Sequence, residues 1–224
     1  MPSEIWTLSG PANGTLADLG VESAAVQFSR FATDRLSLVF SDPNHAATAW
    51  SEGDAVVLSR DGSPFFRGHV QHPARTASER GDNLGVVIHS VWQQISTLPF
   101  LQVWTSWTGN ATGNATHARI VLGQTTDGLH TDTAEALTEI FAYLAAKSID
   151  IDLGDIPAGK IVPKIVTHSR TCGDLLQQVL KYHPECDGWL DHTLSPPVWH
   201  LVPAADLDEA VIDATGHPIT AYSL

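Results

Sequence analysis

The sequence predicts an α+β fold, in which a small antiparallel β-barrel at the N-terminus is followed by a compact α/β unit with two helices and a small sheet. Two observations carry this prediction. Apolar and polar residues alternate with period two in the first hundred residues, and apolar residues recur at helical spacing after Thr131. Turn residues also separate the short apolar runs. We therefore expect two units of different class, a barrel over 1–100 and an α/β domain over 131–204.

The first hundred residues carry the signals of short strands joined by turns. Leu36, Leu38 and Phe40 alternate with smaller or more polar neighbours, which is typical of a strand with one buried face. Asp61 and Gly62 can take the positive φ angles of a tight hairpin turn. Further strands are expected at 55–59, 65–70 and 85–91. Several short strands of this kind predict a small antiparallel barrel.

A segment that is rich in tryptophan and almost free of charge follows the predicted barrel. Residues 81–118 contain Asp82 and no other Asp, Glu, Lys or Arg. We expect 101–130 to form an uncharged aromatic linker or loop. Its later part, 104–117, has no helical period and is expected to be a long loop or an irregular hairpin. Trp104 and Trp107 either fill the end of the barrel or form a contact surface, since exposed aromatic residues without charges are typical of interfaces. We predict that both touch a neighbouring subunit.

The predicted α/β unit begins with a helix. Thr131 or Thr133 can cap this helix, which we expect over 134–146. A second helix is expected to begin at Thr171. Strand-like segments surround it, at 160–167, 188–191 and 198–202. These elements make a compact unit of two helices and a small sheet.

The last residues differ from the rest of the chain in charge. After Lys181 the chain has no basic residue and several acidic ones. The segment 205–224 ends in an alternating run, 219–224, that is typical of a strand. We expect this return segment to pair with the first barrel or to begin a second one, in which case the chain is a fragment.

The composition argues against several classes of protein. The 224 residues include 12 basic and 25 acidic residues, a net charge of −13. A phosphate backbone would be repelled, so we expect no nucleic-acid binding. No apolar run approaches the ~20 residues of a membrane span, so no membrane insertion is expected. Cys172 and Cys186 lie at the two ends of a predicted helix, too far apart for a disulfide, and we expect two reduced thiols.

Metal and nucleotide motifs are also missing from the sequence. Glycine-rich phosphate loops and the short zinc-protease motif do not occur. The segment 150–155 begins like a calcium loop but lacks its glutamate at the twelfth position. His183, Cys186 and His192, with Cys172 nearby, have suitable ligand atoms for zinc, but their spacing matches no established zinc finger. We therefore expect neither a metal nor a cofactor.

Paired carboxylates are hard to recognise in a sequence, because they pair in space. Asp187 and Asp191 flank Trp189, an arrangement that glycosidases and sugar-binding sites also present. Glu185 is a third candidate. A solvated acidic strand edge explains the same residues, and no nucleophile with an adjacent base can be named. Both interpretations of these carboxylates stay open at this point.

Five segments follow one another in an order that is typical of one family: Arg35–Phe40, Trp50–Asp54, Val56–Leu58, Asp61–Gly62 and Phe66–Val70. They resemble the opening of phage tail baseplate hub proteins, the late-control-D-like family that is related to the base of type VI secretion spikes. The two predicted helices and the final hairpin fit later parts of the same pattern. Hub proteins usually continue into a second barrel, whereas this chain stops where that barrel would begin.

The resemblance implies a structural function without enzymatic activity. Hub proteins assemble as a ring, usually a trimer, that joins the tail tube to the spike. The expected partners are therefore further copies of this chain together with tail tube and spike proteins, and the expected location is the virion tail after assembly in the bacterial cytoplasm. The alternatives are another tail-end adaptor, a tail-associated glycan or cell-wall hydrolase, and a carbohydrate-binding module.

Overall fold

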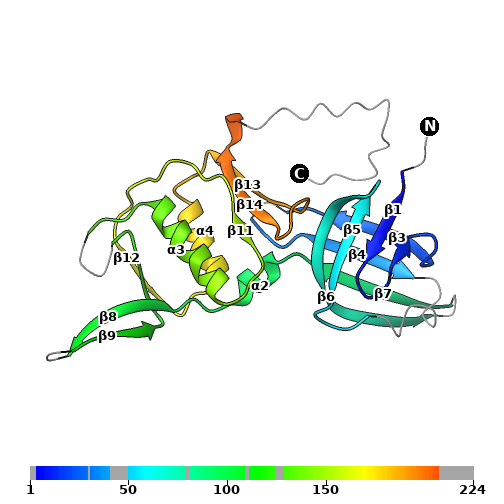
Figure 1. Ribbon diagram of the computed structural model, residues 1–224, viewed down its shortest axis with the longest axis horizontal. Coiled ribbons are helices and arrows are strands. Elements are labelled where there is room, and N and C mark those ends of the chain that lie inside the picture. Colours follow the sequence, from blue (N-terminus) through cyan, green and yellow to red (C-terminus); the bar gives the residue numbers. More distant parts are fainter. Residues whose placement is uncertain are drawn as a thin grey trace.

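The computed structural model of the chain describes residues 4–29, 31–40, 50–78, 81–108, 111–124 and 129–206. A curled β-sheet and a mixed unit of helices and short sheets lie next to each other along the long axis (Figure 1). The predicted α+β fold is confirmed, since the described residues form mostly antiparallel sheet with three α-helices. None of these helices is long and apolar enough to cross a membrane.

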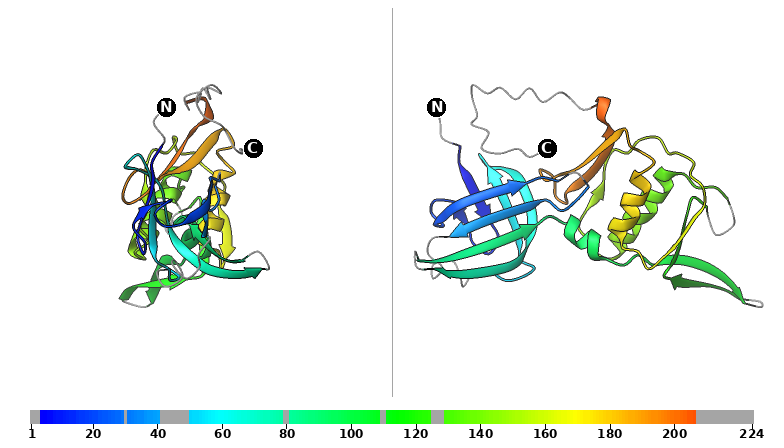
Figure 2. Two further views of the ribbon diagram at one scale, coloured as in Figure 1. Left: turned by 90° about the vertical axis from the view of Figure 1, so that its right-hand side faces the viewer. Right: turned by 180° about the vertical axis from the view of Figure 1, so that it is seen from behind.

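The N-terminal unit is one seven-stranded antiparallel sheet with the strand order β2-β1-β5-β6-β7-β4-β3. Its strands are β1 (Trp6–Ser9), β2 (Gly14–Thr15), β3 (Val21–Gln27), β4 (Arg35–Phe40), β5 (Ala55–Arg60), β6 (Ser63–Ser78) and β7 (Gly81–His89). The sheet curls around its own core (Figure 2). The strands β2 and β3 are the two edge strands of this sheet. The Val21 N–H at the start of β3 donates to the carbonyl of Leu16, the residue that follows β2, at 2.9 Å.

Alternation along the strands explains the burial of one sheet face. Leu36, Leu38 and Phe40 on β4 are buried, and the residues between them are partly exposed. Each such side chain contributes about 2 kcal/mol when removed from water. Asp61 and Gly62 have φ angles of 51° and 83° and form the predicted turn between β5 and β6. The core of the sheet consists of Leu8, Leu36, Leu38, Phe40, Trp50, Val56, Leu58, Phe66, Val70, Leu84, Val86 and Ile88.

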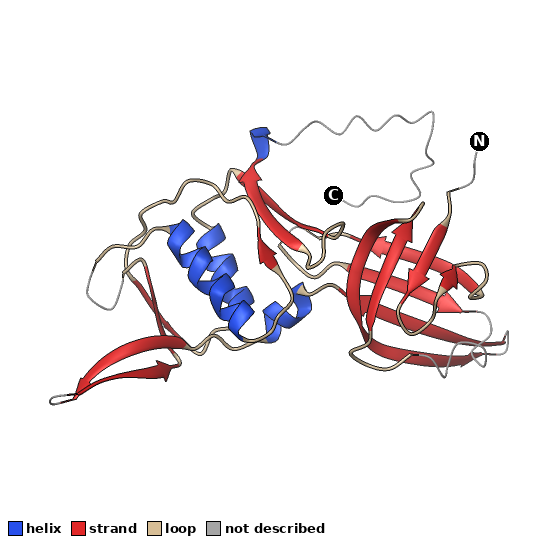
Figure 3. Ribbon diagram, in the orientation of Figure 1, coloured by secondary structure: helices blue, strands red, loops and turns tan. Residues whose placement is uncertain are grey.

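The second unit contains helices and three small sheets, paired β8-β9, β10-β12 and β11-β14-β13 (Figure 3). Its helices are α2 (Trp92–Thr97), α3 (Thr133–Ala146), α4 (Cys172–Leu180) and a short 3₁₀ turn (Ala204–Asp206). Its strands are β8 (Gln102–Thr108), β9 (Ala111–His117), β10 (Arg119–Leu122), β11 (Asp152–Leu153), β12 (Ile165–His168), β13 (Cys186–Asp191) and β14 (Val198–Pro203). Only β11 and β14 run parallel among the described pairs.

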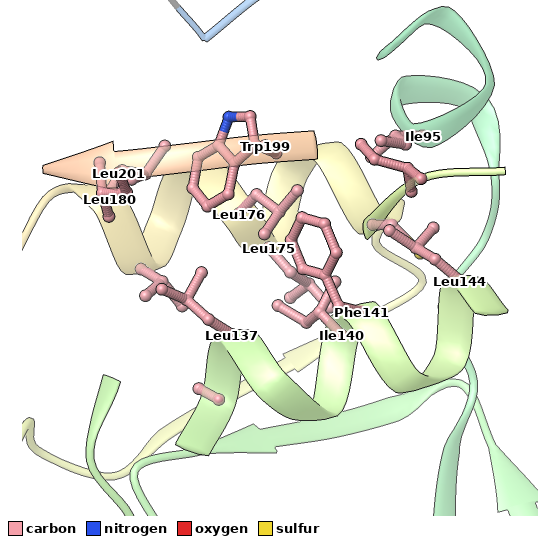
Figure 4. Packing of buried hydrophobic residues seen from close by; sticks show 14 of the residues in the cluster. Ile95, Leu137, Ile140, Phe141, Leu144, Leu175, Leu176, Leu180, Trp199 and Leu201 are labelled. Carbon is pink, nitrogen blue, oxygen red and sulfur yellow. The ribbon is translucent and has the colours of Figure 1, made fainter. Parts of the chain in front are cut away.

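The core of the second unit lies between α3, α4 and β14 (Figure 4). Trp199 on β14 is 1% exposed and stacks on Phe141 of α3, with ring centroids 5.6 Å apart. Leu137 and Ile140 of α3 and Leu176 of α4 point into the same space. The spacing of three and four residues along α3 places these side chains on one helix face.

The helix α3 begins at a residue that the sequence prediction missed. Its N-cap is Asp132, so Thr131 and Thr133 are both wrong as caps. The Asp132 carboxylate accepts the Glu135 N–H, and the Glu135 carboxylate accepts the Asp132 N–H, each at 2.9 Å. This reciprocal pair is a capping box. Thr133 is buried, and its hydroxyl contacts His183.

Other boundaries also differ from the sequence prediction. The strand expected at 160–167 is the shorter β12. Residues 75–78 and 81–83, from a polar stretch expected between strands, are paired backbone at the ends of β6 and β7. In the segment 101–130, the β8–β9 hairpin is the second of the two alternatives expected for 104–117, whereas the strand β10 was not expected.

The two units have separate hydrophobic clusters. The second cluster starts at Val91 and includes Ile120 and Leu122. Residues from 1–100 and from 101–130 therefore contribute to the α/β core. The division of the chain into domains stays a prediction, and 207–224, most of the expected return segment, lies outside the described residues.

Candidate functional site

The predicted contact residues Trp104 and Trp107 lie on β8, in the hairpin with β9. Their backbone partners across the hairpin are Ala115 and Thr112. Their side chains lie outside the described part of the structure, so the subunit contact stays a prediction. The hairpin extends away from the helices (Figures 1 and 2), and 102–117 contain no Asp, Glu, Lys or Arg. A neighbouring subunit can therefore cover the hairpin without removing a charge from water.

The base of the hairpin is anchored by Gln102, which is 8% exposed. Its side-chain amide donates to the Val121 carbonyl at 3.0 Å and accepts the Val121 N–H at 2.8 Å. The same amide donates to the Glu139 carboxylate on α3 at 3.2 Å. Buried hydrogen bonds of this kind are costly to break, so they fix the start of the hairpin to β10 and α3.

The acidic candidates Asp187 and Asp191 lie on β13 with Trp189 between them. Trp189 is 39% exposed and stacks on His200 of β14, with ring centroids 5.3 Å apart. Four positions along a strand correspond to about 13 Å. The paired carboxylates of glycosidases lie about 5–10 Å apart. The strand geometry therefore does not bring Asp187 and Asp191 together as an acid–base pair.

Asp191 and Glu185, two of the three acidic candidates, have pKa values below the usual range for their side chains. Burial raises the pKa of Asp191, but the N–H and hydroxyl of Thr193 donate to this carboxylate at 2.8 and 2.6 Å and hold its pKa below the usual value. The hydrogen bond from the Lys160 ammonium lowers the pKa of Glu185. A glycosidase acid needs the opposite shift, because it must carry a proton near neutral pH.

The structure separates the four residues considered as zinc ligands. His183 and Cys186 lie together, beside Glu185. Cys172 is buried at the start of α4, where burial raises its pKa to about 11. Neither cysteine forms a disulfide, as expected. His192 lies elsewhere, in a contact with the N-terminal sheet.

His192 belongs to a buried junction between the two units that the sequence did not reveal. Its Nε2 lies 3.0 Å from an Asp34 carboxylate oxygen, and its Nδ1 accepts the Arg67 N–H at 3.1 Å. The Arg67 guanidinium donates back to the His192 carbonyl at 2.9 Å. The imidazole also stacks on Phe66, with ring centroids 5.0 Å apart. Asp34 and His192 are separated by 158 residues, so no local pattern signals their contact.

A pocket on the N-terminal sheet is the second feature that sequence reasoning missed. It has a volume of about 380 Å³ and is lined by Trp6, Leu16, Ala24, Val26, Leu58 and Phe65. Four of these six residues come from the first thirty positions, where the sequence pattern predicts no individual strand. The lining is apolar and supplies no acid, base or nucleophile.

Solved structures with a similar fold include two tail proteins and a type VI secretion component. A tail protein from Neisseria meningitidis MC58 matches 88% of the chain with a TM-score of 0.54 and 11% identity. The 43 kDa tail protein of prophage MuSo2 from Shewanella oneidensis matches 89% with a TM-score of 0.53 and 13% identity. An Escherichia coli type VI secretion component, described as structurally similar to bacteriophage T4 tail proteins gp27 and gp5, matches 87% with a TM-score of 0.50 and 9% identity.

These similarities confirm the predicted resemblance at the level of the fold. The chain spans about half the length of the solved structures, covering 50%, 56% and 48% of them. The sequence matches no protein-family model, and no curated protein shows a significant match to it.

Proposed function

We propose that the protein is a non-enzymatic structural component of a phage or prophage tail baseplate hub, in which a ring of identical copies joins the tail tube to the spike. The observation that carries this proposal is the fold, which resembles that of two tail proteins and a type VI secretion component over 87–89% of the chain. A homotrimer is the ring that the hub resemblance implies. The protein would lie in the virion tail after assembly in the bacterial cytoplasm.

The β8–β9 hairpin is the proposed contact between copies. It is a two-stranded sheet, so within the described residues each strand has an outer edge that no other strand covers. An open strand edge can pair with another chain, and a closed ring removes this hazard. Trp104 and Trp107 would supply apolar area at this contact, and the uncharged hairpin sequence favours burial.

The mass of the assembled species tests this proposal. Native mass spectrometry and analytical ultracentrifugation of the full-length protein should show a closed ring, with three copies expected. The double variant Trp104→Ser/Trp107→Ser should shift the population towards monomer, because the proposed contact loses its largest apolar groups.

The matched control is Trp189→Ser, which removes an exposed tryptophan from β13 and should leave the ring intact. A full-length protein that stays monomeric at every concentration contradicts the hub proposal. A ring that survives the double variant contradicts the role of the two tryptophans but not ring assembly.

A further inference from the structure

Three possible metal-ligand atoms meet in the turn that joins α4 to β13. A ring nitrogen of His183, a carboxylate oxygen of Glu185 and the sulfur of Cys186 all lie within 4.8 Å of one another. His183 is 2% exposed, Cys186 is fully buried, and the Glu185 side chain is 49% exposed. The group is therefore closed on the protein side and open to solvent at the carboxylate.

One ring nitrogen of His183 is buried without a hydrogen bond. Nε2 lies 2.7 Å from the Thr133 hydroxyl, which also accepts the Lys160 N–H at 2.9 Å. Nδ1 has no hydrogen-bond partner among the described residues, and its distance to the Glu185 carboxylate is 3.9 Å. A buried polar atom without a partner costs about 1–3 kcal/mol. This cost calls for a physical explanation.

A metal-binding histidine has the same arrangement. One ring nitrogen is held by a polar partner, which sets the tautomer and the orientation of the ring, while the other nitrogen keeps a lone pair for the metal. Here Thr133 would hold Nε2, so the lone pair of Nδ1 would face Glu185 and Cys186. Because Thr133 is itself fixed by the Lys160 backbone, the ring orientation depends on two neighbouring segments.

We propose that His183, Glu185 and Cys186 form a zinc site with three protein ligands and one water. Imidazole, thiolate and carboxylate together favour Zn²⁺ over Mg²⁺ or Ca²⁺, which prefer oxygen ligands. Ligand atoms around a tetrahedral zinc lie roughly 3.5 Å apart, so side-chain shifts on the order of 1 Å would close the group. On binding, the Cys186 thiol releases its proton to solvent and coordinates as thiolate.

Lys160 competes with the metal for Glu185. Its ammonium group donates to the Glu185 carboxylate and, at 2.9 Å, to the Tyr182 carbonyl. A bound zinc ion must displace this ammonium or use the second carboxylate oxygen. Removing the ammonium should therefore strengthen zinc binding, which is a result that a merely structural ion pair does not predict.

Zinc titration of the reduced, chelator-treated full-length chain tests the site. Isothermal titration calorimetry should show one Zn²⁺ per chain, and Co²⁺ as a spectroscopic probe should give thiolate charge-transfer absorption. Cys186→Ala should abolish this absorption and weaken Zn²⁺ binding at least about tenfold. Lys160→Met should tighten binding, and the control Cys172→Ala should leave both signals unchanged.

Glu185→Gln serves as a second variant, because it changes a half-exposed side chain and does not disturb the core. It should weaken Zn²⁺ binding while the circular dichroism spectrum stays that of the wild type. The proposal is overturned if the wild type binds no stoichiometric Zn²⁺, or if Cys186→Ala and Glu185→Gln bind it as tightly as the wild type. These outcomes do not depend on ring assembly.

Discussion

At the scale of single residues, the junction of Asp34 and His192 is the clearest example of a polar contact that restricts substitution. The Asp34 carboxylate accepts the Ser29 N–H at 2.7 Å and lies 3.0 Å from the His192 Nε2. Because the His192 Nδ1 accepts the Arg67 N–H, the ring proton lies on Nε2, and His192 donates to Asp34. The carboxylate therefore accepts at both oxygens, and it does so while 4% exposed.

Asp34→Asn should destabilise the protein although it preserves shape. An amide has one accepting oxygen, so its NH₂ group must face either the Ser29 N–H or the His192 Nε2–H. Two buried donors that face each other without an acceptor lower the free energy of unfolding by about 2 kcal/mol. Urea denaturation should show this loss of unfolding free energy, whereas Asp18→Asn, at an exposed carboxylate, should change it little. Equal stability of the two variants would contradict the assignment of the His192 proton.

His89 should make the stability of the protein depend on pH. Burial, and then the nearby Arg35 guanidinium, lower the pKa of His89, and its Nδ1 is buried without a hydrogen-bond partner among the described residues. Below about pH 6.5 the unfolded chain binds a proton that the folded chain does not, so stability falls as the pH falls. His89→Gln should reduce the loss of unfolding free energy between about pH 7 and pH 5. His168→Gln, at an exposed histidine, is the control. An unchanged pH dependence in His89→Gln would show that His89 does not cause the loss of stability at low pH.

At the scale of elements, α4 begins with its own capping box. The Thr171 hydroxyl accepts the Asp174 N–H at 3.1 Å, and the Asp174 carboxylate accepts the Thr171 N–H at 3.2 Å. Thr171→Ala should cost about 1 kcal/mol of unfolding free energy, because it leaves a helix N–H without its partner. Thr138→Ala is a matched control within α3, where the hydroxyl donates only to the Ala134 carbonyl. Thermal denaturation should show a clearly lower midpoint for Thr171→Ala, whereas the midpoint of Thr138→Ala should stay close to that of the wild type.

The elements that the sequence predicted well are those whose signals are local. The alternation at Leu36, Leu38 and Phe40 and the turn at Asp61 and Gly62 depend only on neighbouring residues, and the structure confirms both. The paired ends of β6 and β7 were missed because their pairing uses backbone groups, whatever the polarity of the side chains. The strands of the first thirty residues were missed for lack of a clear alternation: β3 is mostly exposed.

The candidate sites depend on contacts between distant segments, so the sequence predicted less of them. The histidine and cysteine types suggested a metal cluster, but only the fold separates His192 from His183 and adds Glu185. The junction with Asp34 leaves no trace in local spacing. Trp104 and Trp107 stand out by composition, because uncharged aromatic segments are uncommon on protein surfaces, and their contacts stay a prediction.

At the scale of the whole molecule, two hydrophobic clusters are joined by a polar junction. The whole chain carries a net charge of −13. Identical copies of an acidic chain repel one another, so an assembly of this protein must overcome that repulsion through apolar and backbone contacts. The uncharged β8–β9 hairpin is the described segment where such contacts have the lowest electrostatic cost.

Salt should therefore strengthen the proposed ring. Raising the ionic strength from about 0.01 M to about 0.5 M shortens the Debye length from ~30 Å to less than 10 Å, which screens repulsion between copies. Sedimentation velocity at fixed protein concentration should show a larger assembled fraction at high salt, and Trp104→Ser/Trp107→Ser should lose most of this gain. Assembly that weakens with salt would instead mean that complementary charges hold the copies together, and the contact would then have to lie away from a hairpin without charges.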